Sequence, residues 1–354
     1  MLKTLQALAT YHRDHINLPI IAITGSNGKT TTKELINATL SKKYSTRATI
    51  GNLNNHIGVP LTLLSMDKTT EIGIVEMGAN HLNEIAFLCN IAKPDYGYIT
   101  NFGKAHLEGF GSLEGVIKGK TELYDYLIKN DKTIFTNSND SVQVEKTKKA
   151  KHTFSFGSNA SDVLVELKGL SPYVEAGFKG KEIYSQLIGE YNFNNISAAI
   201  TIANYFEVND KDIKAAIESY LPQNNRSQII EKGTNKIILD AYNANPTSMT
   251  AALLNFEKLN DKFKVTILGD MFELGKDSTT EHQNIADLAS TLIIDKIILI
   301  GQNFSKVKIV SSKVLIFNSF EDFKENGAIS SFNNYTFLIK GSRGMALERV
   351  LDLL

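Results

Sequence analysis

A glycine-containing loop near the N-terminus carries residue types that bind phosphate groups. It follows the apolar run Ile20–Thr24 and reads Gly25-Ser26-Asn27-Gly28-Lys29-Thr30-Thr31. The backbone N–H groups of such a loop can surround phosphates, Lys29 can reach the β- and γ-phosphates, and the Thr30 hydroxyl can ligate Mg²⁺. The common pattern has its first glycine where this chain has Ile23, so we interpret the loop as a shortened P-loop.

Two further side chains that can bind a metal follow predicted strands. Glu76 ends the run Ile72–Glu76, and His106 lies beyond Tyr96–Thr100 in a glycine-rich loop. Parallel sheets bind ligands at the carboxyl ends of their strands, where a carboxylate could hold Mg²⁺ opposite Thr30. An imidazole there could be a metal ligand or a general base. The alternatives are a solvated strand-end acid and an ordinary surface histidine.

Two lysines and two asparagines lie in predicted helices. Lys118 and Lys120 precede Thr121-Glu122-Leu123-Tyr124, and taken alone they would form a solvated basic face. Asn192 and Asn195 lie at a helix start, where they could cap the helix or read the edge of a nucleotide base.

Three loops in the second half of the chain also follow strands. Their sequences are Asp240-Ala241-Tyr242-Asn243-Ala244-Asn245-Pro246, Gly269-Asp270-Met271-Phe272-Glu273-Leu274-Gly275 and Lys340-Gly341-Ser342-Arg343-Gly344. The last is cationic and flanked by glycine, which suits an anionic group of a substrate.

The elements that must position these residues alternate between strand and helix. Strands are predicted at Ile20–Thr24, Ile72–Glu76, Tyr96–Thr100 and Thr133–Thr136, and helices at Met1–His15, Lys29–Lys43, Asn83–Ile91 and Leu113–Lys129. Short strands between Thr153 and Leu187 indicate an antiparallel insert or edge sheet, and helices follow at Asn194–Tyr205 and Asp210–Tyr220. This alternation predicts an α/β fold with a mostly parallel sheet.

The polar segment Leu221–Ser227 divides the chain, and the alternation then restarts. Strands are predicted at Lys236–Asp240, Phe263–Leu268, Lys296–Ile300 and Tyr335–Lys340, with helices at Thr247–Leu259 and Glu281–Leu292. We therefore expect a packing helix over 1–19, a central P-loop domain over 20–221 and a smaller Rossmann-like α/β domain over 222–354.

Composition narrows the class of protein. The chain has 354 residues, of which 42% are hydrophobic and 21% charged, and its net charge is zero. Such a balance argues against a nucleic-acid binder that relies on bulk charge. The single cysteine, Cys89, excludes an intrachain disulfide framework, and no apolar run is long enough for a membrane span. We expect a cytoplasmic monomer.

Taken together, these motifs resemble those of the Mur ligases, ATP-dependent amide ligases of peptidoglycan synthesis, and most closely those of the MurF ligases. The resemblance covers essentially the whole chain. Besides the P-loop, it rests on the strings Gly51-Asn52-Leu53-Asn54-Asn55-His56-Ile57-Gly58-Val59-Pro60-Leu61-Thr62, Glu76-Met77-Gly78-Ala79-Asn80, Thr100-Asn101-Phe102-Gly103-Lys104-Ala105-His106-Leu107-Glu108-Gly109-Phe110-Gly111-Ser112 and Asp240–Pro246, on the Asn192/Asn195 pair, and on Lys340-Gly341-Ser342-Arg343.

The resemblance implies a role for each matching residue. Lys29 and Thr30 would hold the ATP phosphates, and Thr30 and Glu76 would bind a first Mg²⁺. His106 and a carbamylated Lys120 would bind a second Mg²⁺. The implied nucleotide contacts are Gly25, Ser26, Asn27, Gly28, Lys29, Thr30, Thr31, Asn192 and Asn195 (adenine), Arg226, and Asp240 (ribose). The implied substrate contacts are Asn54 and Asn55 for the sugar peptide and Lys340, Ser342 and Arg343 for the incoming dipeptide.

The implied reaction joins D-alanyl-D-alanine to UDP-N-acetylmuramoyl-tripeptide through an acyl phosphate. Members of the family carry an N-terminal domain that binds UDP, whereas this sequence reaches its P-loop strand by Ile20. We therefore expect ATP to bind and the UDP-sugar peptide to bind poorly. The alternatives are a ligase resembling folylpolyglutamate synthase, which lacks that domain, and an inactive ATP-binding partner protein.

Overall fold

The chain divides into two compact units, each with its own sheet. The computed structural model describes every residue except 171, 223–224, 328 and 330–331. Unit 1 comprises Met1–Gly103, Gly109–Gln186 and Glu190–Tyr220, and unit 2 comprises Lys104–Glu108, Leu187–Gly189 and Leu221–Leu354. Residues 223–224 of the predicted dividing segment lie outside the described residues. The division at 221/222 into separately folding domains remains a prediction.

Unit 1 is built on a six-stranded parallel sheet with the strand order β2-β3-β1-β4-β5-β6. Its strands are β1 (Ile20–Thr24), β2 (Thr46–Ala48), β3 (Ile72–Glu76), β4 (Tyr96–Ile99), β5 (Thr133–Asn137) and β6 (Thr153–Phe156). Every residue of β1 and β3 is buried. Continuous apolar strands of this kind are typical of parallel sheets that helices cover.

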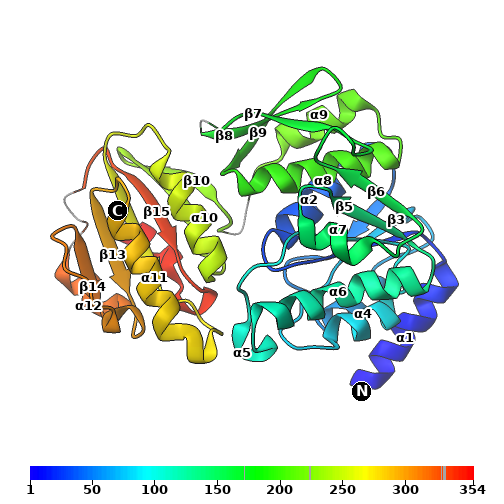
Figure 1. Ribbon diagram of the computed structural model, residues 1–354, viewed down its shortest axis with the longest axis horizontal. Coiled ribbons are helices and arrows are strands. Elements are labelled where there is room, and N and C mark those ends of the chain that lie inside the picture. Colours follow the sequence, from blue (N-terminus) through cyan, green and yellow to red (C-terminus); the bar gives the residue numbers. More distant parts are fainter. Residues whose placement is uncertain (171, 223–224, 328, 330–331) are drawn as a thin grey trace. The chain divides into compact units, whose positions relative to one another are not determined.

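Helices precede, connect and follow the strands of unit 1 (Figure 1). They are α1 (Leu2–Ile16), α2 (Lys29–Leu40), α3 (Gly58–Leu64), α4 (Glu84–Ala92), α5 (Leu107–Phe110), α6 (Leu113–Lys129), α7 (Ser141–Thr147), α8 (Tyr191–Tyr205) and α9 (Asp210–Ser219), with α5 straddling the two units. α2 packs against α8, and α6 packs against α4 and on β4 and β5. A separate three-stranded sheet contains β7 (Val165–Gly169), β8 (Tyr173–Phe178) and β9 (Lys181–Ile188), with β7 antiparallel to β8.

Unit 2 contains a mixed, mostly parallel sheet with the strand order β10-β11-β15-β12-β13-β14. Its strands are β10 (Gln228–Lys232), β11 (Asn235–Asp240), β12 (Lys264–Gly269), β13 (Lys296–Ile300), β14 (Val314–Phe317) and β15 (Thr336–Lys340). Only the β10/β11 pairing is antiparallel. The α-helices are α10 (Pro246–Glu257), α11 (Ser278–Thr291) and α12 (Phe320–Asn326), and the short 3-10 turns are η1 (Gly275–Asp277), η2 (Phe304–Lys306), η3 (Arg343–Met345) and η4 (Leu347–Leu353).

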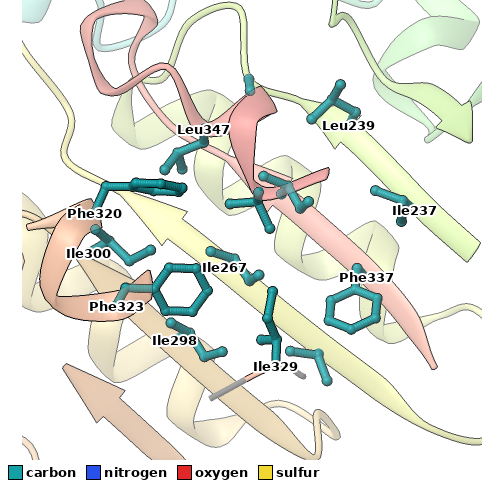
Figure 2. Packing of buried hydrophobic residues seen from close by; sticks show 14 residues of the cluster. Ile237, Leu239, Ile267, Ile298, Ile300, Phe320, Phe323, Ile329, Phe337 and Leu347 are labelled. Carbon is teal, nitrogen blue, oxygen red and sulfur yellow. The ribbon is translucent and has the colours of Figure 1, made fainter. Parts of the chain in front are cut away.

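One hydrophobic core cluster of unit 2 lies where the sheet meets α12 and the C-terminal turns. Figure 2 shows Phe320 and Phe323 packed with strand residues such as Ile267 and Ile298, and with Leu347. α10 begins with a capping box between Asn245 and Ser248, and Pro246 directly follows Asn245 at a position where a missing N–H costs nothing. None of the helices among the described residues is long and apolar enough to cross a bilayer.

The predicted fold class is confirmed, and the differences are local. The predicted helix from Lys29 ends at Leu40 rather than Lys43, because the chain turns there with Lys42 donating to Thr39. α3 was not predicted, since its first turn contains Gly58 and Pro60. A proline is tolerated in a first turn, where its nitrogen needs no acceptor.

A buried histidine in unit 2 should make the stability of the protein depend on pH. His282 of α11 is fully buried; its Nε2 accepts from the Met271 N–H at 3.0 Å, and its Nδ1 lies 2.7 Å from the Ser278 carbonyl oxygen, to which it donates. Burial lowers the pKa of His282, so the native state keeps this ring neutral.

We expect acidification below about pH 6.5 to destabilise the protein through His282. There the unfolded chain binds a proton that the native state excludes, so the free energy of unfolding falls by up to ~1.4 kcal/mol per pH unit. His282→Gln keeps an acceptor and should lose this dependence. Thermal unfolding of both proteins at pH 7.5, 6.5 and 5.5 tests this, and equal pH slopes would contradict it.

Candidate functional site

The loop that the sequence predicts to bind phosphate, residues 25–31, joins β1 to the start of α2 and is held by a neighbouring loop. Asn27 N–H donates to Asn101 Oδ1 at 3.0 Å, and Ser26 N–H donates to the Asn101 carbonyl oxygen at 3.0 Å. Two of the loop amides are thus bonded within the protein. The first bond of α2 runs from Thr32 N–H to Gly28 O, so the preceding turn forms the positive end of the helix, where anions bind.

Glycines let this loop follow its path. Gly25 has φ +139°, and a Cβ there would lie 2.0 Å from Thr100 Oγ1. Gly28 has φ +79°, and a Cβ there would lie 2.6 Å from Asn195 Oδ1. Lys29 is half-buried, and its ammonium donates to the Gly25 carbonyl oxygen at 2.8 Å. Larger residues at Gly25 or Gly28 would therefore displace the loop.

Glu76 lies at the carboxyl end of β3 as predicted, but it is not a solvated acid. Its side chain is only 1% exposed. Asn54 Nδ2 donates to Oε1 at 2.8 Å, whereas Oε2 is buried and has no hydrogen-bond partner among the described residues. An uncompensated buried carboxylate oxygen is costly, and a bound cation is one partner that would satisfy it.

Lys120 and Lys118 lie in the same helix, α6, in opposite environments. Lys118 is exposed, which agrees with the alternative of a solvated basic face for this residue. Lys120 is fully buried; its Nζ donates to the Ala79 carbonyl oxygen at 2.8 Å and lies 5.2 Å from the centre of the Phe110 ring. Burial and, secondarily, the charge of Lys29 hold the pKa of Lys120 well below its usual value. The solvated-face alternative is therefore wrong for Lys120.

The two asparagines of α8 connect that helix to α2. Asn195 Oδ1 accepts from Thr32 Oγ1 at 3.0 Å, and Asn195 Nδ2 donates to Asn192 Oδ1 at 2.8 Å. Both side chains are buried. The cap position of α8 is Glu190, so the helix-capping alternative is wrong for this pair. The pair fixes α8 against the helix that begins at the phosphate-binding loop.

Asn55 acts locally in the loop before α3. Its Oδ1 accepts from the N–H groups of Ile57 and Gly58, each at 3.0 Å. These contacts hold the start of α3, and the Asn55 residue as a whole remains exposed.

Unit 2 contains the other predicted residues, including His106, whose segment Lys104–Glu108 groups with it. His106 is partly buried with φ +54°, and its Nδ1 lies 2.5 Å from Glu273 Oε2, which lowers the pKa of Glu273. Arg226 stacks on the Tyr242 ring at 3.6 Å. The structure thus places His106 beside a carboxylate that the sequence did not single out as a partner.

Asp240 and Lys340 end neighbouring strands and pair with each other. Lys340 Nζ lies 2.5 Å from Asp240 Oδ2 and also donates to the Asn243 carbonyl oxygen at 3.1 Å. Ser342 is buried and accepts from the Phe272 N–H, whereas Arg343 is exposed and pairs with Glu348 at 2.7 Å. Of the two cations in this loop, Lys340 is buried and Arg343 is exposed.

Sequence reasoning missed two residues that organise the site, Thr49 and Lys33. Thr49 Oγ1 accepts from the Glu76 N–H at 2.9 Å, and the buried Lys33 Nζ donates to the Thr49 carbonyl oxygen at 2.7 Å. The positions of Lys33 and Lys29, four residues apart on α2, were a weak signal for a second inward lysine. Thr49 follows the short strand β2 and gave no signal.

The described residues contain no group of three or more His, Cys, Asp or Glu side chains that could hold a metal ion. Mg²⁺ in nucleotide sites commonly uses one or two carboxylates together with phosphate oxygens and water, so a single buried Glu76 oxygen fits this pattern.

Comparison with known proteins identifies the family. Residues 23–203 match the Mur ligase middle domain, and residues 225–343 match the Mur ligase, glutamate ligase domain. The UDP-N-acetylmuramoyl-tripeptide–D-alanyl-D-alanine ligase of Bacillus subtilis is 33% identical over 368 residues, covering 99% of this chain and 79% of the relative.

Solved structures agree with this comparison. MurF from Acinetobacter baumannii superimposes with a TM-score of 0.90 at 33% identity, over 99% of this chain and 80% of that one. MurF from Thermotoga maritima in complex with ADP has a TM-score of 0.88 at 25% identity, over 99% and 83%. The chain therefore belongs to the Mur ligase family of ATP-dependent amide ligases, and within it to the MurF ligases.

Proposed function

We propose that this chain joins D-alanyl-D-alanine to UDP-N-acetylmuramoyl-tripeptide, with hydrolysis of ATP to ADP, in the synthesis of peptidoglycan precursors. The observation that carries the proposal is the match to a Bacillus subtilis ligase of that name over 99% of this chain. Residues suited to phosphoryl transfer lie within the matched region: Lys29 at the start of α2, a buried Glu76 and a buried Lys120.

ATP is the proposed nucleotide. A related MurF binds ADP, and the loop from Gly25 to Thr31 has the residue types for its phosphates. Asn192 and Asn195 are proposed to support the adenine site, with Arg226 and Asp240 contributing from unit 2. Because the amides of Asn195 and Asn192 bond to each other and to Thr32, we expect them to shape this site as a pair.

Two Mg²⁺ ions are proposed. The buried Oε2 of Glu76, which has no partner among the described residues, and the Thr30 hydroxyl would hold the first ion, and His106 and a carbamylated Lys120 would hold the second. Bound Mg²⁺ would supply neutralisation of the charge on the phosphate oxygens. The lowered pKa of Lys120 supports carbamylation, because only a neutral amine adds CO₂.

The proposed reaction has two steps. The terminal carboxylate of the tripeptide attacks the γ-phosphorus of ATP, and the bond between that phosphorus and the bridging oxygen to the β-phosphate breaks. ADP departs, and the tripeptide becomes an acyl phosphate. The amine of D-alanyl-D-alanine then attacks the acyl carbon, loses a proton, and inorganic phosphate departs. The chain contributes position and charge: Lys29 at the transferred phosphate, and Asn55, Lys340, Ser342 and Arg343 at the substrates.

The test is release of ADP and phosphate by the purified chain with Mg-ATP at high concentrations of both substrates. We expect release to require both, and the product mass to equal that of the pentapeptide. Turnover with tetrahydrofolate and glutamate instead would favour the folylpolyglutamate synthase alternative. Binding of ATP with no turnover on any of these substrates would favour the inactive partner protein and contradict the proposal.

A further inference from the structure

The contacts around Glu76 leave only one of its two carboxylate oxygens available. Asn54 Nδ2 lies 2.8 Å from Oε1, while the buried Oε2 has no partner in the described parts of the chain. A carboxylate only accepts hydrogen bonds, so the Asn54 amide must present its NH₂ group to Glu76. This hydrogen bond restricts the orientation of the carboxylate.

Asn54 is itself held in place by the chain that follows Glu76. The Gly78 N–H donates to the Asn54 carbonyl oxygen at 2.7 Å. Gly78 also lies directly against the Asn54 side chain, because a Cβ at Gly78 would come within 2.7 Å of Asn54 Oδ1. The loop at Asn54 is therefore joined to the chain around the end of β3 by a backbone hydrogen bond as well as by the side-chain hydrogen bond to Glu76.

The backbone of Glu76 is fixed independently. Thr49 Oγ1 accepts its N–H, and the Lys33 ammonium holds the Thr49 carbonyl oxygen. Removing the Asn54 amide would thus leave Glu76 buried at the end of β3 but free to rotate about its side-chain torsions. The position of the Glu76 backbone and the orientation of its carboxylate have separate supports.

We propose that Asn54 is a positioning residue that orients Glu76 so that Oε2 alone faces the divalent cation of the nucleotide. The inference rests on the proposed function, and it replaces the expectation that Asn54 contacts the sugar peptide. Groups that hydrogen-bond to a ligating carboxylate fix its orientation, and losing one commonly weakens metal affinity 10–100-fold. Asn54 would act on the cation through Glu76 and not by touching it.

The experiment is calorimetric titration of the full chain with ADP, at a series of Mg²⁺ concentrations and in EDTA. Asn54→Leu keeps the size of the side chain and removes the donor, and Asn54→Ala serves if the leucine variant does not fold. We expect either variant to need about 10–100-fold more Mg²⁺ for tight ADP binding, with ADP affinity in EDTA unchanged. Asn52→Ala, an exposed residue of the same loop, is the matched control, and Glu76→Gln is the reference for losing the ligand.

The outcomes separate this inference from the proposed function. An unchanged Mg²⁺ requirement in a folded Asn54 variant, with a raised requirement in Glu76→Gln, would overturn the role of Asn54 alone. A raised KM for the UDP-sugar peptide with an unchanged Mg²⁺ requirement would also overturn it and restore a substrate contact. If Mg²⁺ does not affect ADP binding even in the wild-type protein, both the inference and the proposed cation site fail.

Discussion

Replacing Lys29 with alanine is expected to lower ATP turnover at least ~10²–10³-fold, the scale for loss of one preorganised charge-stabilising group. Lys29 is the cation at the first position of α2, where the helix dipole also favours an anion. Phosphoryl transfer depends on neutralising charge that develops on the phosphate oxygens, and alanine cannot supply it. The measurement is phosphate release with both substrates saturating.

The fold should survive this substitution, because Lys29 is half-buried and lies at a helix start. Circular dichroism and thermal unfolding check that expectation. Lys42→Ala, at an exposed lysine just beyond the same helix, is the control and should turn over normally. Near-normal turnover by a folded Lys29→Ala protein would refute the assignment of the phosphate-binding loop.

The second large effect is expected at Lys120. Lys120→Ala should lower turnover ~10²-fold or more by removing a proposed charged ligand. In carbamylation the neutral Nζ amine forms a bond to the carbon of CO₂ and releases one proton, which leaves an anionic carbamate. Formate or acetate should partly restore turnover of the alanine variant, because a small carboxylate can enter the space that the side chain leaves.

The structure supplies a matched control on the same helix. Lys118 is exposed whereas Lys120 is fully buried, so Lys118→Ala should keep most activity. A carbamate signal in carbon-13 NMR after incubation with labelled bicarbonate gives a readout independent of turnover, and Lys120→Ala should abolish it. Loss of both activity and signal in Lys118→Ala instead would show that the assignment to Lys120 is wrong.

The sequence predicted the strand-end position of Glu76 and the P-loop between β1 and α2, because both follow from local apolar runs and loop composition. It also predicted most strands of both sheets. It could not predict the partners of these residues. Asn54 reaches Glu76 across 22 positions, and Lys340 reaches Asp240 across 100, because the order of strands sets these contacts.

Burial was the other property that local patterns did not reveal. Lys118 and Lys120 have the same side chain two positions apart, yet the packing of α6 exposes one and buries the other. The α8 asparagines resembled caps because the predicted helix began at Asn194, whereas α8 begins at Tyr191. This shift of three residues in the helix start places both asparagines within α8 and not at its cap.

The strand order of the two sheets has a consequence for synthesis of the protein on the ribosome. In unit 1 the central strand β1 is made first, and later strands can add on either side. In unit 2 the central strand is β15, which comes later in the sequence than the other strands of that sheet and joins β11 to β12. Until Thr336–Lys340 emerges, that sheet exists only as two separate pieces with open edges, and open strand edges pair readily with other chains. Premature termination before β15 should therefore yield an aggregation-prone nascent chain whose first sheet is already formed.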